Sequence, residues 1–580
     1  MKLNPTMLCD FYKVGHKDQY PEDTKIIYST WTCRNSRIDG INSTIFFGLQ
    51  GFIKDILITY FRENFFNRDI HEVLEENREA IEGGLGIINP DLSHIERLWV
   101  IGYLPLEISA LLEGTDVPLR VPSFTIKNTH PEFFWLTNAL ETLISTETWS
   151  AITTSTIARE YRKILNGFAV ETTGSIDGVE FQAHDFSMRG MCGYEHAAKA
   201  GCGHLLSFNG TDCIPSLFYL KDNYSGVIEN CGIGGSIPAT EHSVQCANMP
   251  EDEDETATIK RMITEVYPTG LLSMVLDTND FWKNVTEVLP SLKNTIMKRD
   301  GKFVVRPDSG DPVDIICGTL DEYYDLSEWI DEDDEVDGNI FWESLREEVQ
   351  DDTPHGEIGP DEWSCKYLVN GKYYEATVTN LEWNRYDKQY YFLDMYDSPK
   401  IIFKEIIPTA VEKGLIEVLW DIFGGITNEL GYKVLDEHIG AIYGDSITTE
   451  RARLICQKLK NKGFASTNIV LGVGSYSYAY HTRDTFGMAF KSTYALMKSG
   501  EKLLSKNPKT DSGVKKSQRG MVAVVHSDEG VLTLVDGLDA LGKALIEDKD
   551  LLVPVFRDGK LLVDQTLEEI RGRVKKSLTS

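Results

Sequence analysis

The segment Phe303-Val304-Val305-Arg306-Pro307-Asp308-Ser309-Gly310 carries the main signal for the fold. A short apolar run of strand type leads directly into Arg, Asp and Gly, and a helix-like pattern follows. The same order recurs in five other places: 179–183 before His184, 205–208 before Gly210, 271–276 before Asp277, 439–443 before Gly444, and 469–471 before Gly472. Because alternating strands and helices form parallel sheets, the pattern predicts an α/β protein built on a parallel sheet.

Polar residues follow the apolar run in each of these segments, at the point where a strand would end. Parallel α/β proteins bind ligands beyond the carboxyl ends of their strands, so we expect these side chains to meet at one rim. A single Asp after a strand is commonly a helix cap, and only the set as a whole favours a site. Glycine turns bring backbone N–H groups close to phosphate oxygens, Arg and Lys neutralise them, and Asp accepts hydrogen bonds from ribose hydroxyls. The pattern therefore predicts a site for a phosphorylated sugar.

The composition excludes two classes of partner. The 580 residues include 58 Lys and Arg against 90 Asp and Glu, a net charge of −32 at pH 7. A negative protein repels nucleic-acid phosphates and anionic lipid headgroups over a Debye length of roughly 8 Å. The sequence contains no run of about 18 apolar residues and no signal-peptide core at its amino terminus. We expect a cytoplasmic protein with no nucleic-acid partner and no membrane partner.

Half of the net charge lies in one segment. Residues 321–361 contain 17 Asp and Glu and one basic residue, Arg346, which gives −16. Unpaired acids at this density are too costly to bury, so the segment must be solvated. The next residues, 366–404, alternate like strands around an Asn370-Gly371 turn. We interpret about 320–410 as a folded acidic insertion, peripheral to the chemistry.

Seven short motifs occur in the order that characterises one enzyme family. They are Asp10-x-Tyr12-Lys13-Val14-x-His16, His184-Asp185-Phe186-x-x-Arg189-Gly190, Gly210-Thr211-Asp212, Glu241-His242-Ser243, Arg306-Pro307-Asp308-Ser309-Gly310, Gly444-Asp445 and Thr482-Arg483-Asp484. With these motifs the chain closely resembles the nicotinamide phosphoribosyltransferases, from residue 4 to about 317 and from about 432 to Arg571. The insertion and the Gly474-Ser475-Tyr476 variant resemble the form of the enzyme carried by large bacteriophages, for which the cytoplasm would be that of the host.

The resemblance implies a fold, a domain division and an assembly. Members of this family are type II phosphoribosyltransferases, in which an irregular α/β barrel is joined to a smaller α/β domain made from both chain ends. Applied to this sequence, residues 1–150 together with 490–580 would form the smaller domain, and 151–489 would form the barrel that contains the insertion. The resemblance also implies a homodimer whose active sites are shared between the subunits.

The implied reaction belongs to NAD salvage. Nicotinamide and phosphoribosyl pyrophosphate would give nicotinamide mononucleotide and pyrophosphate. Mg²⁺ would be held chiefly by pyrophosphate oxygens and water, so we expect no dedicated protein metal site. ATP is a candidate co-substrate, because its hydrolysis is coupled to synthesis in the family.

Roles for the pyridine-binding and catalytic residues are carried over position by position. Phe186 and Arg306 would sandwich the pyridine ring, and Tyr12 would reach it from the second subunit. Asp212 would accept a hydrogen bond from the carboxamide. The three catalytic candidates are two carboxylates that would face the ribose and a histidine that ATP would transiently phosphorylate: Asp308, Asp445 and His242.

The remaining predicted residues would bind the phosphoribosyl and diphosphate groups. Glycine turns and cations share this role, several of them across the dimer interface: Arg34, Arg189, Gly444, Gly474, Ser475, Arg483, Lys491 and Lys506. One departure from the family falls here, because Gly474-Ser475-Tyr476 stands where many relatives have three glycines.

Two alternative functions stay open on the sequence alone. A nicotinate phosphoribosyltransferase has the same barrel but would need a cation, not Asp212, to face the carboxylate of its substrate. A catalytically silent binding protein on this scaffold would have lost its strand-end Asp and Arg residues, whereas this chain keeps them all.

Overall fold

A computed structural model describes residues 3–248, 255–320, 362–369, 372–379, 381–384, 389–392, 400–444, 446–508, 510 and 516–578. The chain divides into two compact units. Unit 1 comprises Met1–Ile164, Val179–Ser236 and Gly472–Ser580, and unit 2 comprises Leu165–Gly178 and Ile237–Leu471. Within the described residues, no helix combines the length and apolar character needed to cross a bilayer.

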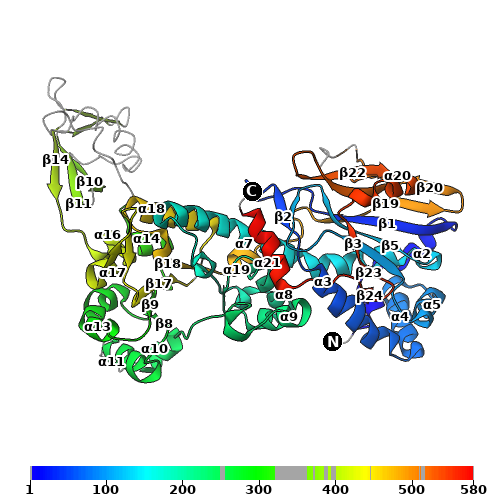
Figure 1. Cartoon of the computed structure of the whole chain (residues 1–580), viewed down its shortest axis with the longest axis horizontal. Helices are drawn as coiled ribbons and strands as arrows, with labels where there is room; N and C mark the ends of the chain where they lie inside the picture. Colours follow the sequence, from blue (N-terminus) through cyan, green and yellow to red (C-terminus); the bar gives the residue numbers. More distant parts are fainter. Residues whose placement is uncertain are drawn as a thin grey trace. The chain divides into compact units, whose positions relative to one another are not determined.

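Unit 1 is built on a seven-stranded antiparallel sheet to which both chain ends contribute. Its order is β20-β19-β1-β5-β3-β23-β24. The strands are β1 (Thr24–Thr32), β3 (Leu106–Ala110), β5 (Pro122–Asn128), β19 (Ala489–Met497), β20 (Gly500–Leu503), β23 (Val553–Arg557) and β24 (Lys560–Leu561). Figure 1 shows the blue amino-terminal strand β1 lying beside the orange carboxyl-terminal strand β19. The predicted domain made from both chain ends is thereby confirmed.

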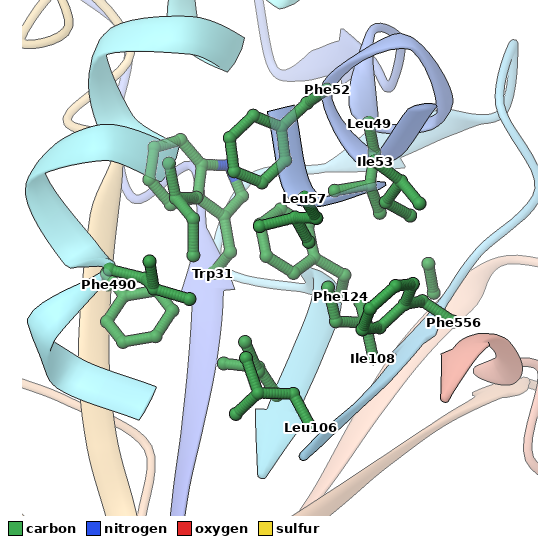
Figure 2. Packing of buried hydrophobic residues seen from close by; sticks show 14 of the residues in the cluster. Trp31, Leu49, Phe52, Ile53, Leu57, Leu106, Ile108, Phe124, Phe490 and Phe556 are labelled. Carbon is green, nitrogen blue, oxygen red and sulfur yellow. The ribbon is translucent and has the colours of Figure 1, made fainter. Parts of the chain in front are cut away.

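The core of unit 1 forms around Trp31. Trp31 is opposite Phe124 of β5 and Phe490 of β19 in register, and its ring stacks on Phe124 with centroids 5.6 Å apart. Figure 2 shows these rings packed with Phe52 and Leu57 from the helical segment 49–60. Because large aromatic side chains occupy opposite positions on three adjacent strands, cross-strand packing fixes the register of the sheet.

Helices α4 (Ile70–Leu85) and α5 (Ser93–Ile101) add buried residues to this core. Unit 1 also contains α8 (Tyr194–His204), α9 (Ile214–Tyr224) and α21 (Leu567–Ser577). Helices α8 and α9 share a buried cluster with Phe47 near the amino terminus and with Ile570 of α21. This shared cluster is why residues 179–236 pack with the chain ends, although the sequence places them with the barrel. The long helix α7 (Glu141–Thr173) passes from one unit into the other.

The parallel sheet has the order β7-β6-β18-β17-β9-β8. Its strands are β6 (Ala183–Asp185), β7 (Gly210–Thr211), β8 (Leu272–Val275), β9 (Phe303–Arg306), β17 (Ile439–Tyr443) and β18 (Ile469–Val473). The pairings of β6 with β7, β8 with β9, β9 with β17 and β17 with β18 are all parallel, as the strand-and-helix pattern predicts. The boundary between the two units falls inside β18.

Two of the six predicted strands differ from the observed elements. Residues Val179–Phe181 form a short 3-10 helix, and β6 begins only at Ala183. Residues 205–208 are not a strand, because the N–H groups of Leu205 and Phe208 donate to carbonyls four residues earlier and prolong the end of α8. The apolar side chains of 205–208 are buried, so this apolar run reflects burial and not an extended backbone.

An irregular segment, 235–239, runs along the two edge strands of this sheet. Gly235 pairs in parallel with Gly210 of β7, and Ala239 pairs in parallel with Ser273 of β8. Each contact is a single bridge and not a ladder. The parallel sheet agrees with the α/β fold expected from the family, and segment 235–239 adds single bridges and no regular strand.

In unit 2 helices follow the strands, as βαβ units require. They include α13 (Leu289–Ile296), α14 (Pro312–Cys317), α17 (Leu415–Phe423) and α18 (Thr449–Asn461). Beyond α14 lies a small antiparallel sheet of β10 (Glu362–Val369), β11 (Lys372–Thr379) and β14 (Lys400–Glu405). Tyr373 of β11 contacts Glu417 of α17. The predicted strands of 366–404 are confirmed. Their turn, Asn370-Gly371, and the acidic run 321–361 lie outside the described residues.

Candidate active site

The end of β6 and the loop after β7 bring three predicted-motif side chains together in unit 1. His184 Nε2 lies 2.8 Å from Asp212 Oδ1, and the His184 ring packs on Phe186 with centroids 4.6 Å apart. Ser236 Oγ donates to the same Asp212 oxygen at 2.5 Å. The Phe186 N–H donates to the Val473 carbonyl of β18 at 3.0 Å, which fixes the backbone beneath the ring. Phe186 and Asp212, predicted to bind one pyridine substrate, thus share a histidine neighbour.

Gly210 makes room for this histidine. A Cβ at Gly210 would lie 2.8 Å from His184 Nδ1, closer than real Cβ atoms approach, and 3.2 Å from the Ala183 carbonyl oxygen. Behind it, His204 Nε2 contacts the Gly210 carbonyl at 3.0 Å, and His204 Nδ1 contacts the Tyr478 hydroxyl at 2.7 Å. Burial lowers the pKa of His204 to about 4, so this second histidine is a neutral member of the core.

The predicted phosphate turn Gly474-Ser475 touches the turn that carries the predicted cation Arg189. A Cβ on Gly190 would lie 2.2 Å from Ser475 Oγ, so only glycine allows this approach of the Arg189-Gly190 turn. Gly474 precedes the short helix α19 (Ser475–Ala479) in extended backbone, and Arg189 is exposed. The variant residue Tyr476 is also exposed and stacks on Tyr480, with ring centroids 4.9 Å apart. The tyrosine therefore points to solvent and leaves the turn unfilled.

A cationic cluster lies near the ends of β1 and β19. Lys491 Nζ is 3.4 Å from Glu141 Oε1, and Lys13 is paired with the other oxygen of the same carboxylate. Burial lowers the pKa of Lys491, Glu141 opposes this shift, and the positive charges of Arg34 and Lys13 add to it. Arg34 is anchored by a hydrogen bond from its Nε to the Gly487 carbonyl at 2.9 Å. Lys13 and Glu141 had no role in the sequence-based prediction of the site.

Three further predicted residues of unit 1 lie on its surface. Arg483 is exposed and pairs with Asp484 at 3.1 Å. Lys506 is exposed, and its backbone N–H donates to Ser517 Oγ at 2.8 Å. Tyr12, on α1 (Phe11–Val14), has 61 % of its surface exposed. An aromatic ring this exposed is available to another molecule, as the predicted role across a dimer interface requires.

In unit 2, the ends of β9 and β17 bring together Arg306, Asp308 and Gly444. Arg306 Nη2 donates to Asp308 Oδ1 at 3.1 Å. A Cβ on Gly444 would lie 1.9 Å from that same oxygen and 2.8 Å from Arg306 Nε. Gly444 is therefore required by the ion pair. Asp445, the next residue, lies outside the described residues.

Asp277, at the end of β8, joins this cluster and has no assigned role in the sequence-based site. Its Oδ2 accepts the Asp308 N–H at 2.9 Å and the Ser309 hydroxyl at 2.6 Å. Its buried Oδ1 has no hydrogen-bond partner among the described residues. The sequence feature that could have identified Asp277 is its position directly after an apolar run, the same position that Arg306 has after 303–305.

His242 faces both of these carboxylates. Its Nε2 lies 3.7 Å from Asp308 Oδ2 and 3.8 Å from Asp277 Oδ1, and its Nδ1 is 3.1 Å from Thr278 Oγ1. The ring is about half exposed, with 48 % of the side chain accessible. A histidine held between two acids and open to solvent can act as a nucleophile or exchange a proton.

Comparisons with known proteins show which proteins this chain resembles. Residues 181–332 and 402–553 match the model of the nicotinate phosphoribosyltransferase (NAPRTase) family, and residues 4–75 match the nicotinamide phosphoribosyltransferase N-terminal domain. A relative from Acinetobacter baylyi named nicotinamide phosphoribosyltransferase is 40% identical over 592 residues, covering 100% of this chain and 98% of the relative. A relative of the same name from Mycoplasma pneumoniae is 29% identical over 524 residues, covering 88% of this chain and 93% of the relative.

A solved structure similar to this chain is the nicotinate-nucleotide pyrophosphorylase from Pyrococcus furiosus, with a TM-score of 0.49, 11% sequence identity, and coverage of 99% of this chain and 96% of that one.

The family matches define the class: the chain belongs to the nicotinate phosphoribosyltransferase family and is a phosphoribosyltransferase. Within that family, its N-terminal domain and its relatives over the full length place it among the nicotinamide phosphoribosyltransferases. The family model leaves residues 333–401 unmatched, and these lie inside the segment interpreted above as an insertion.

Proposed function

We propose that this enzyme joins nicotinamide to the ribose of phosphoribosyl pyrophosphate, giving nicotinamide mononucleotide and pyrophosphate. The observation that carries the choice of nicotinamide is Asp212. His184 and Ser236 both contact this carboxylate, and His184 also packs on the Phe186 ring. A carboxylate accepts the N–H of an amide but repels a second carboxylate. A nicotinate enzyme would need a cation at this position, so Asp212 argues against that alternative.

The catalytic groups match the charges that develop during displacement. When the pyridine nitrogen attacks the anomeric carbon and the pyrophosphate leaves, positive charge builds on the ribose and negative charge on the leaving group. We assign Asp308 and Asp445 to the ribose, with Arg306 holding Asp308 in position at 3.1 Å. The cations Arg34, Arg189 and Lys491 are assigned to the phosphates.

The remaining assignments follow the same logic. The Gly444 and Gly474-Ser475 turns would receive the 5′-phosphate, and Arg483 and Lys506 the diphosphate. Mg²⁺ would enter as the complex with phosphoribosyl pyrophosphate, held chiefly by pyrophosphate oxygens and water. Bound there, it would neutralise the leaving group.

His242 is assigned to ATP coupling and not to the transfer itself. Capture of a phosphoryl group needs a nucleophilic imidazole, whereas in the transfer the pyridine nitrogen is already the nucleophile. The half-exposed ring between Asp277 and Asp308 supports this role. His242→Ala should abolish any stimulation by ATP and retain basal synthesis. Equal loss of both activities would assign the ring to the transfer.

The test of the proposed function is a direct assay with both pyridines. The purified chain is supplied with phosphoribosyl pyrophosphate, Mg²⁺ and either nicotinamide or nicotinate, and the nucleotide and pyrophosphate are quantified. We expect equal amounts of nicotinamide mononucleotide and pyrophosphate, with nicotinate used about a thousandfold less well or worse. Failure to form nucleotide from nicotinamide would overturn the proposal.

We also propose a cytoplasmic homodimer in which Tyr12 and Arg34 serve the site of the partner subunit. The exposure of Tyr12 supports this arrangement, because a substrate-stacking ring must be covered when the site is complete.

A further inference from the structure

One oxygen of Asp212 is contacted by two side chains from different parts of unit 1. His184, at the end of β6, places its Nε2 2.8 Å from this oxygen. Ser236, in the irregular segment 235–239, donates its hydroxyl to the same oxygen at 2.5 Å. Ser236 Oγ is also 3.4 Å from His184 Nε2, so the three polar groups form a closed triangle. These contacts hold one oxygen of the carboxylate in place.

The surroundings of His184 hold the imidazole firmly. Its side chain is only 9 % exposed, and its ring packs on Phe186. Gly210 leaves the space that its Nδ1 side occupies, because a Cβ there would lie 2.8 Å from that nitrogen. Asp212 itself is 45 % exposed, so without its partners the carboxylate could rotate toward water.

We infer that His184 and Ser236 are the positioning residues that set the preference of this enzyme for an amide over an acid. The inference rests on the proposed function and extends it from Asp212 to the two side chains that contact it. The contacts from His184 and Ser236 hold one Asp212 oxygen in place, so that the carboxylate can accept the N–H of the substrate carboxamide and repel a substrate carboxylate.

The same imidazole also links the two parts of the pyridine site. It contacts Phe186, the predicted stacking ring, and Asp212, the predicted selector. Loss of the Nε2 donor should allow the Asp212 carboxylate to rotate toward water. This rotation weakens recognition of the amide and also weakens repulsion of nicotinate, so the preference for nicotinamide falls.

The experiment measures the ratio of kcat/KM for nicotinamide to kcat/KM for nicotinate in the wild type and four variants. His184→Phe keeps a ring against Phe186 but removes the donor, whereas His184→Gln places an amide N–H near the former Nε2 position. Ser236→Ala removes the second donor. Ser499→Ala is the matched control, because Ser499 Oγ donates to the Asp23 carboxylate at 3.0 Å elsewhere in unit 1. If part of a preparation is unfolded, the apparent kcat/KM falls by the same factor for both substrates, so their ratio does not change.

We expect His184→Phe to lower the ratio by about tenfold or more, the scale of a lost hydrogen bond to a charged group. Ser236→Ala should lower it less, His184→Gln should recover much of it, and Ser499→Ala should match the wild type. The KM for phosphoribosyl pyrophosphate should stay within about twofold in all variants.

An unchanged ratio in both His184→Phe and Ser236→Ala would overturn the inference while leaving the proposed function intact. Equal loss in His184→Gln and His184→Phe would also overturn it, because shape and not the donor would then decide. A wild type that forms no nicotinamide mononucleotide would instead refute the proposed function.

Discussion

At the scale of single residues, the site depends on contacts that glycine allows and on partners that no local pattern reveals. Gly444 and Asp308 stand in recognisable motifs, and the sequence identified both. His184, Asp212 and Ser236 form their triangle across 24 to 52 residues of chain. Ser236 follows no apolar run and belongs to no motif, so its place could not be predicted. Tertiary geometry alone brings it to Asp212.

Gly444→Ala should reduce activity strongly and leave the protein folded. The new Cβ would lie 1.9 Å from Asp308 Oδ1 and 2.8 Å from Arg306 Nε, so both side chains must move. A displacement of about 1 Å at reacting groups costs roughly a hundredfold in kcat/KM. Because the displaced atoms belong to side chains and not to backbone, the midpoint of urea unfolding should change little.

Gly167→Ala, in the helix α7 that links the units, is the matched control. A Cβ there meets nothing within 4 Å, and alanine favours a helix interior. This variant should be slightly more stable and fully active. Normal activity in Gly444→Ala would show that the Arg306–Asp308 pair is not part of the site.

At the scale of elements, the apolar runs predicted most of the strands correctly, but one buried helical end was mistaken for a strand. The apolar run 439–443 coincides with β17, and 303–305 with β9, because buried parallel strands are continuously apolar. The run 205–208 is equally apolar, yet it prolongs a helix. Its side chains are buried, and burial requires apolar residues in a helix as well as in a strand. Apolar runs of four residues cannot separate these cases.

The segment interpreted as an insertion begins and ends at one place. The Thr319 N–H donates to the Val411 carbonyl at 3.2 Å, and a Cβ on Gly318 would lie 2.2 Å from the Glu412 carbonyl oxygen. Replacing 321–408 by a short glycine linker should therefore close without strain and retain transferase activity. Removing acidic charge should also lower the KM for the polyanionic substrate at low salt.

Stability should fall in this deletion, because Tyr373 of β11 donates its hydroxyl to Glu417 of α17 at 2.5 Å. Tyr373→Phe in the full chain measures how much this one hydrogen bond contributes to the free energy of unfolding. Complete loss of activity in a deletion whose circular dichroism and unfolding remain cooperative would place the segment in the site or the dimer.

At the scale of the whole molecule, acid should destabilise the fold through buried neutral histidines. Burial lowers the pKa of His204 and of His94 to about 4, while both would titrate near 6.5 in the unfolded chain. Between these values only the unfolded state takes up the protons. The free energy of unfolding therefore falls as the pH drops from about 6.5 to 4, by up to about 3 kcal/mol for each group.

Urea unfolding at a series of pH values checks this expectation. In His204→Gln the dependence on pH should be shallower than in the wild type, even if the variant is less stable at pH 7. An equal slope in both proteins would mean that other groups account for the acid sensitivity.

The assembly is open to a complementation test that uses the exposure of Tyr12. If Tyr12 acts on the site of the partner subunit, Tyr12→Ala and Asp308→Asn are each inactive alone, but a mixed dimer has one doubly substituted site and one intact site. Equal mixing gives half mixed dimers with one working site of two, so about a quarter of wild-type activity should return. The pair Tyr12→Ala and Arg34→Ala is the control: both residues are assigned to the partner's site, so every mixed site carries one substitution and activity should stay low. No recovery in the first pair would place Tyr12 in the site of its own chain, whereas recovery in the control pair would show that Tyr12 and Arg34 of one subunit serve different sites.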